Sequence, residues 1–481
     1  MTEVRVRFAP SPTGYLHVGG LRTALYNYLF ARKHAGKFIL RIEDTDRARF
    51  VEGAVENLIQ TLQWAGLDFD EGPGKQGNHG PYVQSERLSI YREHAHQLLK
   101  TGKAYYAFDT AAELEEMRKT QEKLRLPTKY DRRALKLNPD EVMAKLASGA
   151  PAVIRLKVPD GVTIGFDDIV RGRVEFSADQ LDDQVLLKSD GYPTYHLANV
   201  VDDHLMNISH VIRGEEWLSS TPKHVVLYQF FGWALPVFAH LPLLLNPDRS
   251  KLSKRQGDVA VEDYRKKGYL REALVNFVAF LGWNPGDERE VFLLDELVKE
   301  FSLERVGKSG AIFNIEKLDW LNAEHLRRKS DDEILNMLKS DLLASGMNER
   351  FDSGYLKNVI SAMRERVSFV HDFVEKSPYF FRAPTEYDKD VVQKRWTVGT
   401  PAHLKAYADG LSKCDSPGKD DYESLLVSTV DSLGVPKAAL IHLLRLAVSG
   451  MGVGPGLYDL LFILGKDETI RRINTAIEKL K

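Results

Sequence analysis

The first 42 residues alternate between two spacings of apolar positions. Residues 4–8 alternate apolar and polar side chains and predict a strand, which Pro10 ends. Apolar positions three and four apart then predict a helix over residues 19–33, Gly36 ends it, and residues 38–42 favour a second strand. This order predicts a βαβ unit, whose parallel sheet binds ligands beyond the C-terminal ends of its strands.

The pattern changes several times along the rest of the chain. Residues 101–190 combine a charged helix with short strand-like pieces such as AVIRLKV and GRVEFS. Strand and helix alternation resumes until about residue 255, and beyond residue 330 helical spacing dominates, with Asp331 expected to cap one helix. We therefore predict an α/β fold, in which a Rossmann-like parallel sheet is split by an inserted α+β domain and followed by all-α C-terminal domains.

These changes divide the chain into six predicted segments. The first and third form the halves of a nucleotide-binding catalytic domain, with the insertion between them. Pro436 and Gly450 mark the start and the end of a helix in the last segment. The six segments are residues 1–100, 101–190, 191–255, 256–330, 331–390 and 391–481.

Composition is that of a folded, soluble, multidomain protein. The 481 residues exceed what one core usually supports, and 43% hydrophobic and 28% charged residues are ordinary globular values. No apolar run reaches the roughly 18 residues that a bilayer span needs. The single cysteine, Cys414, excludes intrachain disulfides and a cysteine-cluster zinc site. We expect a cytoplasmic protein with no membrane contact and no zinc.

The net charge of the chain does not indicate nucleic-acid binding, because it is only −2. Basic residues are concentrated locally between Arg118 and Arg133, where seven Lys and Arg face only Glu122 and Asp131. This stretch is a candidate RNA contact. A solvated charged surface explains the same pattern equally well.

Candidate chemistry begins in the loop PSPTGYLHVGG, residues 10–20, which joins the first strand to the first helix. Free N–H groups and the helix dipole at such a terminus favour phosphate. His17 has donors for phosphate oxygens, and Gly19 and Gly20 leave room for an adenine ring against the backbone. Alone, a glycine pair after a histidine is often only a helix entry.

A second candidate element is KLSKR, residues 251–255, which places three cations within five residues. Lys251 and Lys254 are candidates to stabilise the charge of a leaving pyrophosphate. Without context, such a segment is more often a solvated basic turn.

Taken together, these motifs give a specific resemblance. His17 to Gly20 resembles the HIGH signature of class I aminoacyl-tRNA synthetases, and Lys251 to Arg255 resembles their KMSKS signature, with Gly20, Leu252 and Arg255 departing from the pattern. The departures suit the glutamyl branch. Further matching segments are FAPSPTG, RIEDTD, GPYVQSER, LLKSDGYPTYHLANVVDDH and VIRGEEW, so the resemblance to bacterial-type glutamyl enzymes covers essentially the whole chain.

The resemblance implies roles at matching positions. Arg7 and Tyr195 are associated with the glutamate side chain, Arg213 and Asn199 with the α-carboxylate, and Glu43 with the α-ammonium. Which arginine takes which carboxylate stays open. The remaining implied residues are Ala9 and Ser11 for glutamate, and Ser11, His17, Gly19, Gly20, Trp217, Lys251 and Lys254 for ATP.

Two cations and one anion match a dicarboxylate that carries one ammonium. Taken singly, the residues also have ordinary structural interpretations: Tyr195, Asn199 and Trp217 as core residues, and Arg7 and Arg213 as strand arginines. Arg7 and Glu43 are favoured as ligands because both lie at the predicted ligand-binding edge.

The resemblance also implies a substrate and partner set: L-glutamate, ATP with Mg²⁺, and tRNA(Glu), handled by a monomer. The insertion is expected to bind the acceptor end, residues 256–330 the stem, and the last two segments the anticodon, where Arg364 and Arg366 are candidate contacts.

Several alternatives remain at this point. One is a non-discriminating enzyme that also charges tRNA(Gln) with glutamate, and another is a glutaminyl enzyme, which the helical C-terminal pattern disfavours because those enzymes typically carry β-barrels there. A nucleotidyltransferase that never touches RNA would leave the insertion and the helical extension without a purpose. An RNA-binding protein without catalytic activity is disfavoured, because His17 and Lys254 are both present.

Overall fold

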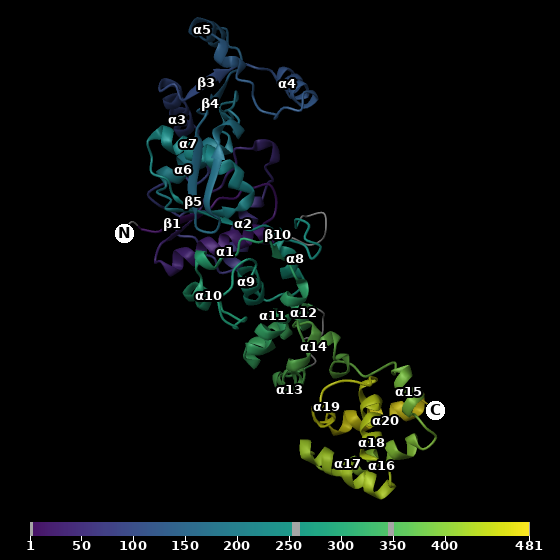
Figure 1. Ribbon diagram of the computed structural model, residues 1–481. Coiled ribbons are helices and arrows are strands. Elements are labelled where there is room, and N and C mark those ends of the chain that lie inside the picture. The colour runs from purple at the N-terminus through teal and green to yellow at the C-terminus, as the bar shows by residue number, and fades with distance from the viewer. Residues whose placement is uncertain (1–2, 253–259, 345–350, 481) are drawn as a thin grey trace. The chain divides into compact units, whose positions relative to one another are not determined.

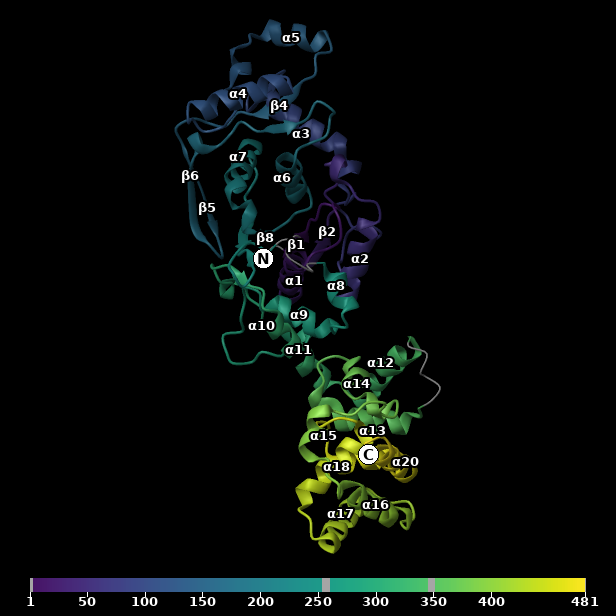
Figure 2. The same cartoon turned by 90° about the vertical axis from the view of Figure 1, so that its right-hand side faces the viewer.

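The computed structural model describes residues 3–252, 260–344 and 351–480. Contacts between residues divide the chain into two compact units (Figures 1 and 2). Unit 1 consists of Met1–Lys267 and Arg271–Leu318, and unit 2 of Gly268–Leu270 and Asp319–Lys481.

A set of parallel strands lies at the centre of unit 1. β1 (Arg5–Phe8) pairs with β2 (Lys37–Leu40), and β8 (His210–Gly214) pairs with β9 (Val237–Leu241). Ser209 joins the two pairs, because its backbone N–H donates to the carbonyl of Arg5 and its hydroxyl accepts from the Arg5 N–H. The predicted βαβ unit is confirmed, since α1 (Val18–Lys33) connects β1 to β2.

Helices cover both faces of these strands. α1 packs on β1, β2 and β8, and α9 (Arg271–Ala279) and α10 (Leu294–Glu300) contact α1 (Figure 2). On the other face, a hydrophobic core joins the strands to α3 (Leu88–Lys100), α6 (Tyr195–Leu205) and α7 (Thr221–Phe231). It includes Ile39, Leu197 and Val225. Because both faces are covered, all four residues of β1 are buried, including Arg5 and Arg7.

Residues 104–187 form two further strand groups. β3 (Ala104–Ala107), β4 (Val153–Leu156) and β7 (Val185–Leu187) make an antiparallel sheet. β5 (Thr163–Asp168) and β6 (Gly172–Ser177) form a hairpin, and β5 also pairs in parallel with β9 at Asp168 and Phe238. The hairpin therefore brings Asp168 against the central strands.

The remaining helices and strands of unit 1 are short or peripheral. They are α2 (Ala54–Trp64), α4 (Ala111–Lys123), α5 (Pro139–Ala147), α8 (Val261–Lys266), β10 (Leu244–Leu245) and β11 (Ala311–Ile312). The basic stretch from Arg118 to Arg133 begins in α4, where Met117 is the buried residue. α11 (Ile315–Arg328) starts in unit 1 and continues into unit 2.

Unit 2 is helical, and its described residues contain no strand. The predicted limits of one helix are confirmed, because Pro436 is the N-cap of α18 and Gly450 its left-handed C-cap, with φ 75°. Asp331 was the wrong cap for α12. Ser330 takes that role instead: its hydroxyl accepts from the Glu333 N–H, and the Glu333 carboxylate accepts from the Ser330 N–H.

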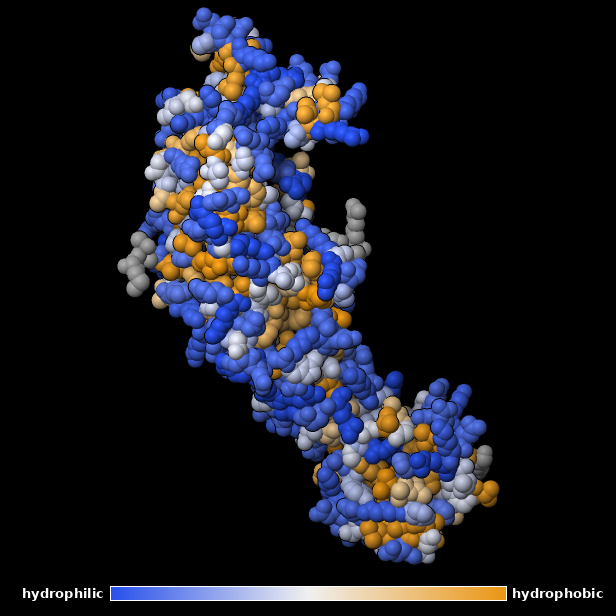
Figure 3. Space-filling view, viewed as in Figure 1, coloured by the Kyte–Doolittle hydropathy of each residue, from blue (hydrophilic) through white to orange (hydrophobic). Residues whose placement is uncertain are grey.

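The other helices of unit 2 have the following bounds: α12 (Asp331–Ala344), α13 (Ser353–Met363), α14 (Asp372–Glu375), α15 (Lys389–Arg395), α16 (Thr400–Ser412), α17 (Lys419–Leu433), α18 (Lys437–Ser449), α19 (Leu457–Leu464) and α20 (Lys466–Lys479). Among the helices in the described ranges, none has both the length and the apolar character that crossing a bilayer requires. The face in Figure 3 intermixes hydrophilic and hydrophobic residues.

Candidate active site

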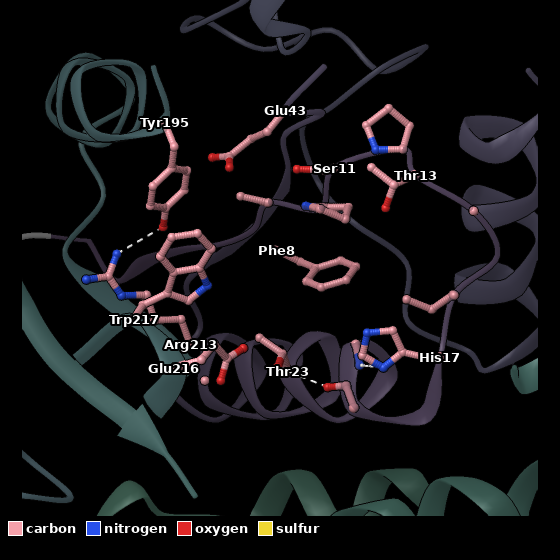
Figure 4. A pocket seen from close by; sticks show the side chains of 18 of the residues that line it. Phe8, Ser11, Thr13, His17, Thr23, Glu43, Tyr195, Arg213, Glu216 and Trp217 are labelled. Atoms are coloured by element: carbon pink, nitrogen blue, oxygen red, sulfur yellow. Dashed lines mark hydrogen bonds between the residues drawn. The ribbon is translucent and has the colours of Figure 1, made fainter. Parts of the chain in front are cut away.

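A cavity of about 920 Å³ opens in unit 1 where β1, β2 and β8 end, a volume within the usual range for ligand sites. Figure 4 shows Tyr195, Arg213 and Trp217 on one side of the cavity and His17 on the other. Its lining includes Arg7, Ala9, Ser11, His17, Gly19, Gly20, Glu43, Tyr195, Arg213, Trp217 and Lys251.

The loop after β1 positions His17 at the N-terminus of α1. His17 is the N-cap, and its Nδ1 accepts from the Gly20 N–H at 3.2 Å. A Cβ at Gly20 would lie 2.6 Å from Cδ1 of Leu16, and one at Gly19 would lie 3.1 Å from the His17 ring. Both glycines therefore preserve the local packing as well as the open cavity wall, and the helix terminus directs its N–H groups towards an anion.

Arg7 reaches the cavity wall already paired with a carboxylate. Its Nε and Nη2 donate to the two oxygens of Asp203 at 3.0 and 3.2 Å, and Nη1 of Arg41 donates to Asp203 at 2.6 Å. Burial opposes the charge of Asp203, but Arg7 and Arg41 together hold its pKa below the usual range. Asn199, with its amide oxygen towards the guanidiniums, accepts from Arg7 and Arg41 at 3.2 Å each.

Glu43 contributes a buried carboxylate to the same wall. It follows β2 and is 5% exposed, and Nη2 of Arg41 donates to its Oε1 at 2.9 Å. Burial raises the pKa of Glu43, and the attraction of Arg41 and then of Arg7 offsets only part of that effect. A cation entering the cavity would therefore favour the charged form of Glu43.

Arg213 is surrounded by neutral groups. It is 4% exposed, and its Nε donates to Nε2 of His240 at 3.1 Å. Its Nη1 donates to Oη of Tyr195 at 3.1 Å, its Nη2 to Oγ1 of Thr221 at 2.9 Å, and both approach Nδ1 of His224 at 3.3 Å. No carboxylate of the described residues pairs with this guanidinium, so Arg213 presents a buried, uncompensated positive charge to the cavity.

Two aromatic residues stand beside Arg213. Tyr195 opens α6 and Trp217 lies on the turn of 3₁₀ helix at Glu215–Ser220, and their ring centroids are 4.0 Å apart at an interplanar angle of 30°. Burial raises the pKa of Tyr195, so its hydroxyl stays protonated at neutral pH. Since Oη accepts from Arg213, the phenol hydrogen is available to donate to a bound anion.

Comparison with known proteins assigns the region that contains this cavity to a catalytic domain family. Residues 3–320 match the family described as tRNA synthetases class I (E and Q), catalytic domain, and residues 332–477 match the anticodon binding domain family. The glutamate–tRNA ligase of Chloroherpeton thalassium is 55% identical over 494 residues, which cover 99% of this chain and 98% of that protein. The chain belongs to the glutamate–tRNA ligase family.

A second relative and a solved structure also match this chain over almost its whole length. The glutamate–tRNA ligase of Chlorobium phaeobacteroides is 55% identical over 490 residues, covering 98% of both chains. The crystal structure of a glutamate tRNA ligase from Elizabethkingia meningosepticum, in complex with its amino acid, matches with a TM-score of 0.96 and 41% identity over the full length of both chains. The family assignment made from the motifs is thus confirmed, as are a class I α/β fold and helical C-terminal part.

The structure brings together most of the predicted site residues of this glutamate–tRNA ligase family member. Asn199 is buried behind the cavity wall and is not among the lining residues. Lys251 lies at the cavity and is exposed, and Lys254 falls outside the described residues. Arg364 and Arg366 lie in unit 2, where Arg364 pairs with Asp331.

The hydrogen-bonded pairs within the protein do not follow the substrate groups to which the resemblance assigns these residues. Tyr195 was grouped with Arg7, and Asn199 with Arg213, but Tyr195 bonds to Arg213 and Asn199 faces Arg7 and Arg41. The reason is topological. Tyr195 is the first residue of α6, beside the end of β8, whereas Asn199 lies one turn further along α6 and faces β1 and β2.

Sequence reasoning missed the residues that support the site from behind: Arg41, Asp168, Asp203, Thr221, His224 and His240. Only Arg41 and Asp203 had a signal, because they lie inside the matched segments RIEDTD and LLKSDGYPTYHLANVVDDH. Their oppositely charged side chains are 162 positions apart, so no local spacing could have paired them.

Proposed function

We propose that this chain joins L-glutamate to tRNA(Glu) at the expense of ATP, through a glutamyl-adenylate that forms in the cavity of unit 1. The observation that carries the proposal is that one cavity has both an uncompensated guanidinium, Arg213, and a buried carboxylate, Glu43, on its walls. An amino acid with an anionic side chain satisfies both groups at once.

The side-chain carboxylate of glutamate belongs on Arg213 and Tyr195. The α-carboxylate is the group that reacts with ATP, so it must point towards the helix terminus at His17, which lies across the cavity from Arg213 (Figure 4). Glu43 then accepts the α-ammonium, and Ala9 and Ser11 border the same space. Arg7 adds positive potential near the α-carboxylate, reduced by its pairing with Asp203.

This arrangement discriminates against glutamine. Its side-chain amide nitrogen would bring N–H donors to the donors of Arg213, and it would leave the buried cation without a counter-charge. Removing such a charge partner costs about 2–5 kcal/mol, a factor of roughly 30 to several thousand.

ATP is expected to bind as its Mg²⁺ complex, with its phosphates at the N-terminus of α1. His17, Gly19 and Gly20 border that end of the cavity, with Trp217 and Lys251 on its lining, and Lys254 completes the proposed set. The metal arrives with the nucleotide as substrate and needs no dedicated protein cage.

The chemistry needs no general base in its first step. An α-carboxylate oxygen attacks the α-phosphorus of ATP, an acyl phosphate bond forms, and the bond to pyrophosphate breaks. A ribose hydroxyl of the terminal adenosine then attacks the carbonyl carbon and gives its proton to a phosphate oxygen of the adenylate, the glutamyl ester forms, and AMP leaves as the acyl phosphate bond breaks. The chain contributes positioning and stabilisation of developing charge by His17, Lys251 and Lys254.

The tRNA would be held by several parts of the chain. We assign the acceptor end to residues 101–190, with the basic stretch from Arg118 to Arg133 as a contact, the stem to residues 256–330, and the anticodon to unit 2 with Arg364 and Arg366. The match of residues 332–477 to an anticodon binding domain supports the last assignment. We further place the reaction in the cytoplasm and assign it to a monomer.

The test is aminoacylation of purified tRNA. The protein is supplied with ATP, Mg²⁺, labelled glutamate or glutamine, and tRNA(Glu) or tRNA(Gln), and acid-precipitable label is measured. The expected product is glutamyl-tRNA(Glu), with glutamine charged at least about 30-fold less efficiently. Charging of tRNA(Gln) with glutamate would indicate relaxed anticodon reading, and no RNA-linked glutamate would contradict the proposal.

A further inference from the structure

A buried Asp–His pair supports Arg213 from the side opposite the cavity. Nδ1 of His240 lies 2.6 Å from Oδ2 of Asp168, and Nε2 of the same ring accepts from Nε of Arg213 at 3.1 Å. Both the Asp168 and His240 side chains are fully buried. The pair lies outside the catalytic signatures, since Asp168 ends β5 and His240 belongs to β9.

The contacts determine which ring nitrogen of His240 carries the proton. Nε of Arg213 is always a donor, so Nε2 of His240 must be an acceptor. The hydrogen of the neutral ring is therefore on Nδ1 and is donated to Asp168. Burial lowers the pKa of His240 to about 4 despite the carboxylate, so the ring is neutral at physiological pH.

Asp168 is itself held rigidly. Its Oδ1 accepts from the backbone N–H groups of Val170 and Arg171 at 2.9 and 2.8 Å. Its Oδ2 accepts from the backbone N–H of His240 at 3.1 Å. The carboxylate has its orientation set by three backbone donors. His240 is therefore held in one orientation, and it transmits that orientation to Arg213.

The pair also controls the charge of the site. Asp203 contacts Arg7 directly and offsets part of its charge, whereas Asp168 is separated from Arg213 by the width of an imidazole ring. A carboxylate in direct contact would compete with the substrate for the guanidinium. A neutral ring fixes the guanidinium without taking its counter-ion.

We propose that Asp168 and His240 are positioning residues for Arg213, which orient its guanidinium, keep it free of an internal counter-charge and thereby set the preference for glutamate over glutamine. This inference rests on the proposed function and adds to it two residues that never touch the substrate. It also gives the β5–β6 hairpin a part in choosing the amino acid.

Two substitutions of His240 separate positioning from mere packing. His240→Leu keeps an apolar side chain of moderate size but removes the acceptor, and His240→Gln places an amide oxygen near the position of Nε2. Steady-state aminoacylation at saturating tRNA gives kcat, KM for glutamate, KM for ATP and the glutamate-to-glutamine ratio of kcat/KM. His204→Leu is the matched control, because His204 stacks on Trp233 and has no contact with Arg213 among the described hydrogen bonds.

The expected result is selective. His240→Leu raises KM for glutamate roughly 10- to 100-fold, the range for losing a hydrogen bond to a charged group, and lowers the glutamate-to-glutamine ratio, while KM for ATP changes less than about 2-fold. His240→Gln regains most of the loss, and His204→Leu keeps the wild-type KM for glutamate.

Asp168→Asn provides the same test without altering the ring. An amide N–H would face Nδ1 of His240 and move the ring hydrogen to Nε2. The Nε2–H of His240 and the Nε–H of Arg213 would then be two donors facing each other, so KM for glutamate rises as in His240→Leu. Equal KM for glutamate in the wild type, Asp168→Asn and His240→Leu, or equal losses for glutamate and ATP, would overturn the positioning role. A wild-type protein that charges no glutamate would instead contradict the proposed function.

Discussion

Arg7 and Arg213 are both buried arginines at the same cavity, yet their neighbours give them different chemistry. Arg7 shares Asp203 with Arg41, so its charge is largely balanced inside the protein. Arg213 meets only histidine, tyrosine and threonine acceptors among the described residues. A substrate carboxylate therefore gains most from Arg213.

Substituting Arg213 tests this difference at a single residue. Arg213→Gln keeps hydrogen-bonding atoms but removes the charge, so KM for glutamate should rise at least about 30-fold and the preference over glutamine should fall by a similar factor. Aminoacylation kinetics with both amino acids measure the change. Arg173→Gln, an exposed substitution on the β5–β6 hairpin, should leave both values unchanged.

Asp203 is expected to matter for folding as much as for the site. Asp203→Asn leaves Arg7 and Arg41 without their shared carboxylate, which should lower the free energy of unfolding by about 3–5 kcal/mol. Denaturant unfolding of the unit 1 transition measures this loss. Asp167→Asn, whose side chain is 84% exposed and pairs with exposed Arg173, should change it by less than about 1 kcal/mol.

The same substitution has a pH signature. The folded pKa of Asp203 is lowered, so its contribution to stability is present above the unfolded pKa of about 3.9 and is lost as pH falls towards the folded value. Between these values the wild type should lose stability more steeply with acid than Asp203→Asn. If the free energy of unfolding fell equally with decreasing pH in the wild type and in Asp203→Asn, the result would contradict the role of this carboxylate.

Single residues of the site differ in how far the sequence predicts them. Arg7, Glu43 and Arg213 follow from motif matching and from their places at strand ends. The partners Asp168 and His240 are 72 positions apart and resemble ordinary strand residues, so only the pairing of β5 with β9 identifies them.

At the scale of elements, the sequence pattern predicts the order of helices and strands well, but it predicts poorly which of their side chains are buried. The alternation in residues 4–8 correctly predicts β1, but alternation usually belongs to a strand with one exposed face, and all four residues of β1 are buried. Arg5 and Arg7 are tolerated there because Glu71 and Asp203 pair with them. Those partners come from distant parts of the chain, beyond the reach of a local pattern.

The cap of α12 offers an element-scale test. Ser330→Ala removes the hydroxyl that accepts from the Glu333 N–H, so the free energy of unfolding of unit 2 should fall by about 1 kcal/mol. Thermal or denaturant unfolding followed by a probe in unit 2 measures it. Ser428→Ala, at an exposed position within α17, is the control and should have little effect; equal effects of the two substitutions would argue against the cap.

At the scale of the whole molecule, the two matched families correspond closely to the two units. The catalytic match ends at residue 320, and the contacts divide the chain at residues 318 and 319. Selection of the amino acid should therefore be separable from selection of the RNA. The sequence pattern alone placed a segment boundary between residues 330 and 331, beyond the end of α11, and α11 itself continues across the division.

Arg366 allows this separation to be measured. Arg366→Glu reverses an exposed charge in unit 2, so kcat/KM for tRNA(Glu) should fall roughly 10-fold near 0.1 M salt and its salt dependence should weaken, while KM for glutamate stays within about 2-fold. Lys100→Glu, at the exposed end of α3 in unit 1 and outside the segments assigned to the RNA, is the control. An unchanged kcat/KM for tRNA(Glu) would remove Arg366 from the RNA contact.

Crystals of the protein grown with L-glutamate would test the account most directly. The account predicts the side-chain carboxylate within hydrogen-bonding distance of the Arg213 guanidinium and of Tyr195 Oη, the ammonium at Glu43, and the α-carboxylate directed towards His17. A glutamate bound in the opposite orientation, or elsewhere while Arg213 keeps only its neutral partners, would contradict it.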